Sequence, residues 1–326
     1  MARGEPVMFS PMASPMEAKR KPELVGKQAY NAKLVEIVSI HDSLRIFRIA
    51  SDDGPISFLP GQYVGLGMGS WEPGDALETT TPDAHDHLIQ RAYSISWPIF
   101  DKQGNLLRPR DPEVLEFYVA LVVRSMPHPQ TLTPRLFHLQ VGDRLWMGEH
   151  ARGTYTLKRA DRSAHLVFVA TGTGEAPHNA MIAELLATGH TGPITNLACV
   201  RYRQDLGYLR QHRELERQFA NYRYLPLTTR EPENLDPSLP QYVGKQYVQD
   251  VFQNWESMVG DDRPLDPKST HVYLCGNPEM IGAPQSLRQQ ARAYPTPTGM
   301  AEILDQLGFQ LDQPKLTGNI HLEKYW

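Results

Sequence analysis

Cysteine is scarce in this sequence, and its scarcity excludes several kinds of site. The chain of 326 residues has two cysteines, Cys199 and Cys275, and each lies in an apolar run typical of a strand. Two thiols are too few for a disulfide framework, or for a zinc or iron–sulfur site built entirely from thiolates. We therefore expect no metal cluster in this chain, and we expect a reducing, cytoplasmic compartment.

Long apolar runs, an excess of positive charge and metal-binding motifs are also missing. No stretch approaches the roughly 18–20 apolar residues of a membrane-spanning helix, and residues 1–22 lack the continuous apolar segment of a secretory signal. The formal net charge is -4, whereas a general nucleic-acid binder is more often basic. No His-Glu-x-x-His spacing suggests a metal hydrolase. We expect no membrane span and no nucleic-acid partner, and we interpret residues 1–26 as a flexible extension.

Short apolar runs separated by turn residues fill residues 27–158. Many short strands with few helical periods predict an antiparallel β-barrel in this part of the chain. The segment Gly67–Gln90 has no periodicity and predicts a long loop. We expect a short helix over Pro134–Leu139, and strands over Ala32–Ile40, Leu44–Ala50, Gln62–Leu66, Arg91–Ser96, Leu115–Val123, Asp143–Met147 and Thr154–Leu157.

Strands and helices alternate in residues 159–326, which form the second expected domain. This alternation predicts an α/β domain whose parallel sheet is wound by right-handed crossovers. The expected helices cover Ala176–Ala187, Leu209–Phe219 and Glu279–Ala293. The expected strands cover His165–Ala170, Asn196–Val200, Tyr222–Leu227 and His271–Cys275.

A glycine-rich turn, Thr171-Gly172-Thr173-Gly174, joins a buried strand to a helix in this second domain. Glycines let the backbone approach a phosphate closely, and a helix N-terminus offers free N–H donors and a partial positive charge. The turn therefore predicts phosphate binding. An ordinary tight strand-to-helix connection is the alternative.

Two segments of the first domain carry groups that suit a flavin nucleotide. Arg91-Ala92-Tyr93-Ser94 places a cation and an aromatic ring on one strand face, because residues two apart share a face. Thr131-Leu132-Thr133 adds hydroxyl and backbone N–H donors at a helix start. An exposed surface arginine and a simple helix cap at Thr133 are the alternatives.

Two further features lie toward the end of the chain. Cys275 ends a strand and precedes Gly-Asn-Pro and a helix, which is where open α/β sheets bind ligands, although most free cysteines are buried hydrophobes. The chain ends on Tyr325-Trp326, an unusual place for an aromatic pair because chain ends usually fray.

Taken in this order, these motifs resemble the ferredoxin–NADP+ reductase family over about residues 32–326. Arg201-Tyr202, Asp205-Leu206 and the Tyr-Trp ending resemble its bacterial branch, whereas Lys245-x-Tyr247 is closer to the plastid branch. The resemblance implies an FAD-binding barrel, an NADP(H)-binding α/β domain, and electron transfer between NADPH and ferredoxin or flavodoxin. The partner contact would be transient and electrostatic, and the protein a monomer.

The resemblance also assigns roles to individual residues. Ser94, Cys275 and Glu323 correspond to the family's active-site residues, and Tyr325 or Trp326 would cover the flavin face until NADP(H) displaces the ring. The other FAD residues would be Arg91, Ala92, Tyr93, Tyr118, Thr131, Leu132, Thr133 and Thr173. The NADP residues would be Gly172, Gly174, Arg201, Thr229, Arg230, Lys245 and Tyr247, with Arg230 binding the 2′-phosphate.

Three other functions stay open. The chain could be the reductase component of an oxygenase or an NADPH-dependent flavin reductase, both of which keep the same two nucleotide sites. A non-catalytic flavin-binding regulator would bind the flavin without oxidising NADPH.

Overall fold

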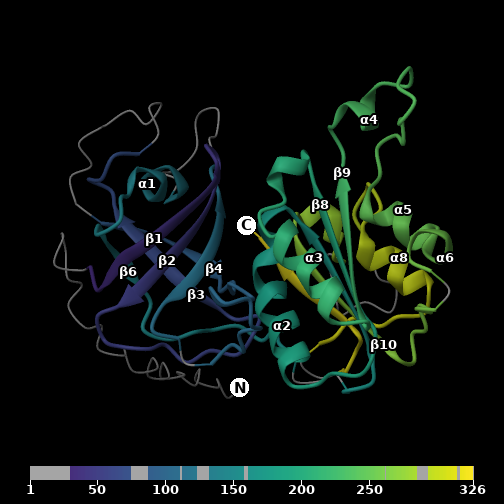
Figure 1. Cartoon of the computed structure of the whole chain (residues 1–326), viewed down its shortest axis with the longest axis horizontal. Coiled ribbons are helices and arrows are strands. Elements are labelled where there is room, and N and C mark those ends of the chain that lie inside the picture. The colour runs from purple at the N-terminus through teal and green to yellow at the C-terminus, as the bar shows by residue number, and fades with distance from the viewer. Residues whose placement is uncertain are drawn as a thin grey trace, which may run out of the picture.

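The structure is a computed structural model, and it describes residues 30–74, 87–110, 112–122, 132–157, 161–260, 262–284, 293–313 and 316–325. An antiparallel sheet and a parallel sheet lie side by side, each with its own helices (Figure 1). The expected extension over residues 1–26, and the expected domain boundary at residues 158 and 159, fall outside the described residues.

The first sheet is an antiparallel barrel, as the short-strand pattern predicted. Its order is β4-β3-β6-β1-β2-β5, every pairing is antiparallel, and the Ser96 N–H donates to the Glu116 carbonyl at 2.8 Å beside β5. Alternate residues point into one apolar core, which the short helix α1 (Leu132–His138) covers with Leu132 and Leu136. The strands are β1 (Ala32–His41), β2 (Leu44–Ser51), β3 (Tyr63–Gly69), β4 (Leu88–Ser94), β5 (Leu115–Ala120) and β6 (Arg144–Met147).

The second sheet is parallel, with the order β11-β10-β7-β8-β9. Its strands are apolar on both faces because helices cover both faces. Helices α2 (Glu175–Ala187) and α3 (Leu209–Gln218) pack on one face, and α5 (Val248–Gln253), α6 (Trp255–Met258) and α8 (Met300–Gln306) on the other. The strands are β7 (His165–Thr171), β8 (Ile194–Val200), β9 (Tyr222–Thr228), β10 (Thr270–Gly276) and β11 (Ile320–Lys324).

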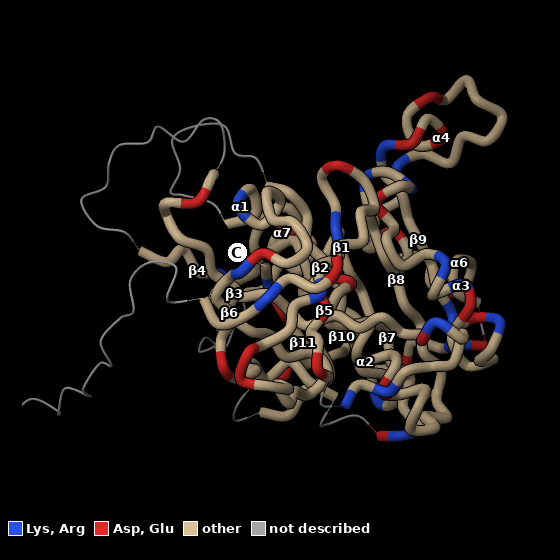
Figure 2. The backbone as a smooth tube through the Cα atoms, turned by 60° about the vertical axis from the view of Figure 1, so that its left-hand side comes forward, with Lys and Arg blue, Asp and Glu red and all other residues tan. Residues whose placement is uncertain are grey.

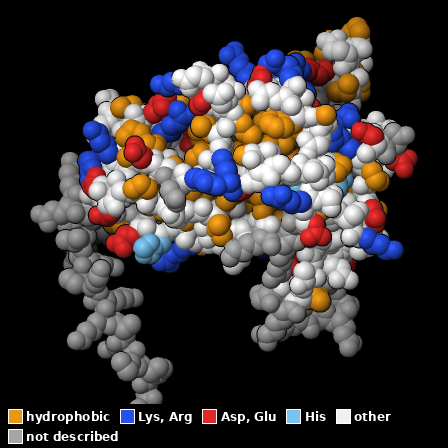
Figure 3. Space-filling view, turned by 60° about the horizontal axis from the view of Figure 1, so that its bottom comes forward, with side chains coloured by type: hydrophobic (Ala, Val, Ile, Leu, Met, Phe, Trp, Pro, Cys, Tyr) orange, Lys and Arg blue, Asp and Glu red, His pale blue; other side chains and the backbone are white. Residues whose placement is uncertain are grey.

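The surface of the described residues is mixed in charge. On the face in Figure 3, basic and acidic side chains are interspersed, with hydrophobic ones between them. The short helix α4 (Pro232–Leu235) lies on a segment that projects from the α/β domain (Figure 2). None of the described helices combines the length and apolar character needed to cross a bilayer.

Some elements expected from the sequence are absent from the structure or differ from it in length. Thr154–Leu157 forms no strand, and the ends of the Gly67–Gln90 loop belong to β3 and β4. Of the helix expected over Glu279–Ala293, the structure shows the short α7 (Pro278–Ile281), which does not continue into residues 282–284, while residues 285–292 lie outside the described part of the chain. Helix α7 ends because Gly282 takes a left-handed conformation with φ 59°, and its backbone packs so closely on Gly299 that a side chain would collide.

A buried polar network joins the two domains. The Tyr208 hydroxyl, from the α/β domain, donates to Glu116 Oε1 of the barrel at 2.8 Å and lies 3.0 Å from Ser96 Oγ. Arg48 Nε donates to the other Glu116 oxygen at 2.8 Å, and Asn179 Nδ2 donates to Ser96 Oγ at 3.2 Å. Burial raises the pKa of Glu116, an effect that Arg48 partly offsets. The buried carboxyl group is therefore satisfied by partners from both domains.

We expect Tyr208→Phe to lower the free energy of unfolding by about 1–3 kcal/mol, because it leaves Glu116 and Ser96 each short of a buried partner. Urea unfolding followed by fluorescence measures the loss. Tyr242→Phe is the control, because the Tyr242 side chain is 44% exposed. Equal stability of the two variants would contradict the role given to this network.

Candidate functional site

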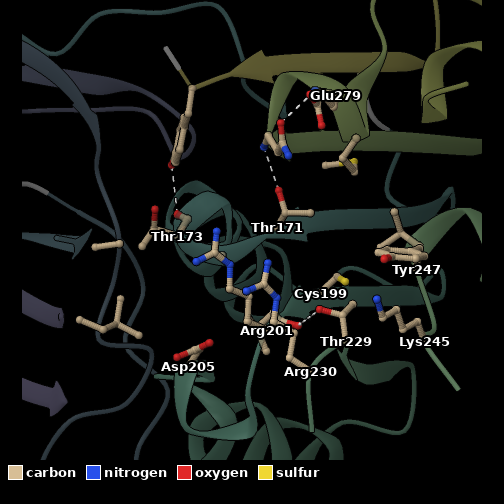
Figure 4. A pocket seen from close by; sticks show the side chains of 18 of the residues that line it. Thr171, Thr173, Cys199, Arg201, Asp205, Thr229, Arg230, Lys245, Tyr247 and Glu279 are labelled. Carbon is tan, nitrogen blue, oxygen red and sulfur yellow. Dashed lines mark hydrogen bonds between the residues drawn. The ribbon is translucent and has the colours of Figure 1, made fainter. Parts of the chain in front are cut away.

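A cavity of about 1160 Å³ opens where the two domains meet, at the carboxyl edge of the parallel sheet. Open α/β sheets bind ligands at this edge, because successive strand ends and helix starts leave backbone donors there. Figure 4 shows side chains of both domains directed into it. The wall from the barrel consists of His41, Ser43, Leu44, Tyr118, Ala120, Leu121 and Val122.

The glycine-rich turn after β7 forms part of the cavity wall. Gly172 has φ 54° and open space beside its Cα, and it lines the cavity together with Thr171 and Thr173. Gly174 faces the other way, where a Cβ would collide with the Cys275 carbonyl. Thr171 Oγ1 accepts a hydrogen bond from the Asn277 N–H at 2.8 Å, which is drawn in Figure 4. The turn is thus fastened to the end of β10, with Gly172 on the open side and Gly174 on the packed side.

Side chains from both domains meet at the hydroxyl of Tyr325. This hydroxyl is hydrogen-bonded to Ser94 of the barrel and to Cys275 of β10, and it donates to the Thr173 carbonyl at 3.2 Å. The Tyr325 N–H also donates to the Gly276 carbonyl at 3.1 Å. Residues that the family resemblance assigned to the active site therefore lie in one cluster, which we call the seam cluster: Ser94, Thr173, Cys275, Glu323 and Tyr325.

Burial controls the charge of the seam cluster. It raises the pKa of the Cys275 thiol and of the Tyr325 phenol well above their usual values, so both stay neutral. Glu323 lies beside Cys275 in the pairing of β10 with β11, and burial raises its pKa to about 7. Glu323 is therefore the member of this cluster that changes charge near neutral pH.

The expected flavin residues lie on and beside β4. Arg91 is exposed, and its guanidinium donates to the Gln90 carbonyl at 2.7 Å. Tyr93 is partly buried against the barrel core, Ser94 ends the strand, and Ala92 is exposed. Thr131 and Trp326 lie outside the described residues.

Three other expected flavin residues have clear structural contacts. Thr133 lies inside α1 and not before it, and its Oγ1 accepts from the Val122 N–H at 3.1 Å. Leu132 is buried in the barrel core. The Tyr118 ring lines the cavity, while its hydroxyl donates to the Asp205 carbonyl at 2.8 Å and accepts from the Gly207 N–H at 3.0 Å. Tyr118 therefore joins the barrel to the α/β domain.

Three basic side chains line the far end of the cavity. Arg201 follows β8, Thr229 and Arg230 follow β9, and Lys245 and Tyr247 precede α5; all five line the cavity (Figure 4). The Arg230 N–H donates to the Arg201 carbonyl at 2.9 Å, which holds the two arginines on adjacent strand ends. The Tyr247 side chain is 47% exposed. Three cations, a hydroxyl and an open ring are a donor set that fits a phosphate and an adenine.

Part of the cavity wall was not anticipated from the sequence. His41 and Ser43 lie between two expected strands and were assigned to no site, and Asp205 was named only as part of a motif. Glu279 and Met280 at the start of α7 also line the cavity. No local signal marks the turn as a site, because it reaches the cavity only when the barrel docks against the α/β domain.

The barrel, the parallel sheet and the cavity between them define a two-domain oxidoreductase with a nucleotide-binding α/β domain. A family model described as an oxidoreductase NAD-binding domain matches residues 168–286. A flavodoxin/ferredoxin–NADP reductase of Buchnera aphidicola is 26% identical over 84% of this chain and 90% of its own length. The phenol hydroxylase P5 protein of Acinetobacter pittii is 24% identical over 87% of this chain and 69% of its own.

Solved structures agree on the fold. A ferredoxin NADP+ reductase from Neisseria gonorrhoeae, determined with bound FAD and NADP, has a TM-score of 0.66 at 19% identity, covering 91% of this chain and 98% of its own. In sequence and in fold, the chain is thus similar to proteins named as ferredoxin–NADP reductases. The resemblance found in the sequence motifs is therefore confirmed, while the roles of the individual site residues stay predictions.

We expect the stability of the wild type to fall relative to Glu323→Gln as pH rises from about 4.5 to about 7. The carboxyl pKa is raised from 4.5 to about 7 in the folded chain, so the folded state holds a proton that the unfolded state has lost in this range. The difference should reach on the order of 1–3 kcal/mol above pH 7. Urea unfolding of both proteins at several pH values measures it.

The exposed Glu256 supplies the control, as Glu256→Gln should track the wild type at every pH. If the stability of Glu323→Gln also follows that of the wild type at every pH, then Glu323 is not a buried acid in the folded protein.

Proposed function

We propose that this protein is an FAD-dependent reductase that moves electrons between NADPH and a one-electron carrier, ferredoxin or flavodoxin. The observation that carries the proposal is the seam cluster, in which Ser94 of one domain and Cys275 of the other meet at the Tyr325 hydroxyl. This cluster adjoins a cavity whose far end holds the cations of a phosphate site. Relatives named as ferredoxin–NADP reductases support the same activity.

The residues of the barrel fit a flavin nucleotide. Bound FAD would supply the hydride and one-electron chemistry, while the chain binds and orients. Arg91 extends from β4 as a cation for the pyrophosphate, and Tyr93, two residues later on the same strand face, offers a ring for the flavin edge. Ser94 places its hydroxyl at the seam, where Tyr325 now holds it.

The seam cluster orients the nicotinamide and controls protons. Cys275 is neutral, so it packs against the nicotinamide ring without adding charge beside a hydride path. Tyr325 fills the seam and yields its contacts to Ser94 and Cys275 when the coenzyme enters. Glu323, whose pKa is raised to about 7, holds a proton next to Cys275.

The cation end of the cavity selects NADP(H). Arg230 and Arg201 bind the 2′-phosphate with their guanidinium groups, Lys245 adds a third positive charge, and Thr229 donates its hydroxyl. Tyr247 stacks its exposed ring on the adenine.

The partner and the location follow from the same proposal. The contact with ferredoxin or flavodoxin is transient and electrostatic, and the chain acts as a monomer in the cytoplasm. Two buried, unpaired thiols suit the reducing conditions there.

A second candidate function is the reductase component of an oxygenase. It is favoured by the relative named as a phenol hydroxylase component, of which this chain spans 69%. The two cysteines cannot hold an iron–sulfur cluster, so in this case a separate protein must receive the electrons. Activity with ferredoxin, with an oxygenase component or with free flavin as the acceptor separates these functions.

The purified protein should be yellow, with flavin absorption that bleaches when NADPH is added without oxygen. The expected stoichiometry is about one FAD per chain, because each domain pair forms one site. A spectrophotometer and an anaerobic cuvette are sufficient. A colourless preparation that cannot take up FAD would end the proposal, and a flavin that NADPH fails to reduce would favour a non-catalytic regulator.

We expect Arg230→Ala to lower kcat/KM for NADPH by about 10- to 100-fold, since it removes charge-assisted hydrogen bonds to the 2′-phosphate. Activity with NADH should change little, because NADH has no such phosphate. Steady-state kinetics with both coenzymes measure the preference. Arg210→Ala removes an exposed arginine on α3 and serves as the control. An unchanged preference would remove Arg230 from the phosphate site.

A further inference from the structure

The turn after β8 places an acidic residue beside the cations of the cavity. Arg201 follows β8 directly, and the short 3-10 helix Arg203–Asp205 comes next. Arg201 and Asp205 both line the cavity, together with Arg230. A carboxylate among phosphate-binding cations has a clear disadvantage, because it can pair with a guanidinium group and compete with the phosphate.

Both oxygens of the Asp205 carboxylate are occupied by other donors. Oδ1 lies 3.0 Å from Nε2 of His41, which ends β1 in the barrel. Oδ2 accepts the Tyr202 N–H at 2.9 Å. The backbone N–H of Ser43 donates to His41 Nδ1 at 3.3 Å, so Nε2 carries the ring proton and donates it to Asp205. A residue of the barrel thus holds a carboxylate of the α/β domain.

The side chains of Arg201 and Arg230 point into the cavity and not toward Asp205 (Figure 4). In Figure 4 the guanidinium groups of Arg201 and Arg230 extend into the middle of the cavity, with Asp205 at its edge. Within the described part of the chain, neither arginine has a carboxylate at ion-pairing distance. The geometry therefore separates Asp205 from Arg201, which directly follows β8, and from Arg230, which follows the adjacent strand β9.

We infer that His41 is a positioning residue for coenzyme recognition. By holding Asp205 toward the barrel, it leaves Arg201 and Arg230 available to the 2′-phosphate of NADP(H). The inference rests on the proposed function, and it makes phosphate affinity depend on how the barrel docks.

The test is the binding of 2′-phospho-AMP and of AMP to the FAD-saturated full chain, measured by calorimetry. The wild type should prefer 2′-phospho-AMP. His41→Ala should weaken the binding of 2′-phospho-AMP by about three- to tenfold, because Asp205 can then pair with the arginines. The affinity for AMP should not change. His41→Gln keeps a donor at a similar reach and should retain the preference.

The double variant His41→Ala, Asp205→Asn carries the decisive result. Removing the competing charge should restore 2′-phospho-AMP affinity, which a merely structural role of His41 would not allow. Asp42→Ala, an exposed change in the same turn, is the control.

Failure of this inference differs from failure of the proposed function. An equal loss for both ligands in His41→Ala, no loss at all, or no recovery in the double variant overturns the role of His41 alone. If the wild type binds the two ligands with equal affinity, the proposed NADP(H) site is wrong, and the inference about His41 fails with it.

Discussion

A buried carboxyl group at the domain boundary is the constraint on which the arrangement of this protein depends. Glu116 sits in the barrel, yet one of its two side-chain partners, Tyr208, belongs to the other domain. An acid removed from water is tolerated only with its hydrogen bonds complete, so the barrel satisfies this group only when the α/β domain is docked. Tyr208 also contacts Ser96, two residues after Ser94. The contact that joins the domains thus also places the barrel's contribution to the seam cluster.

The cavity separates two kinds of chemistry along its length. At the seam, burial keeps Cys275 and Tyr325 neutral, which under the proposed function would keep charge away from the site of hydride transfer. At the other end, Arg201, Arg230 and Lys245 remain exposed to solvent, where phosphate recognition needs charge. Under the proposed function, one coenzyme would be bound through the phosphate at its charged end and oriented by neutral groups at its other end.

Local patterns predicted the elements whose cause is local. The strand before Thr171, the glycine turn and α2 follow from an apolar run, backbone freedom and a helix start within a few residues. The helix expected over Glu279–Ala293 is not continuous, because the close approach of Gly282 to Gly299 ends α7 at Ile281, and that approach depends on a segment further along the chain. β11 and α8 were not anticipated, since each is short and gains its stability by packing on β10 and α5.

The sequence alone predicted the two kinds of sheet and the resemblance to ferredoxin–NADP reductases, because each motif joins a strand end to the backbone chemistry that follows it. Only the tertiary structure decided which of the expected site residues meet. Ser94 and Cys275 are far apart in the chain, and their shared contact with Tyr325 exists because the domains dock. The same holds for His41 and Asp205, whose pairing no periodicity or spacing encodes. Contacts between domains depend on shape and burial, which one-dimensional patterns do not carry.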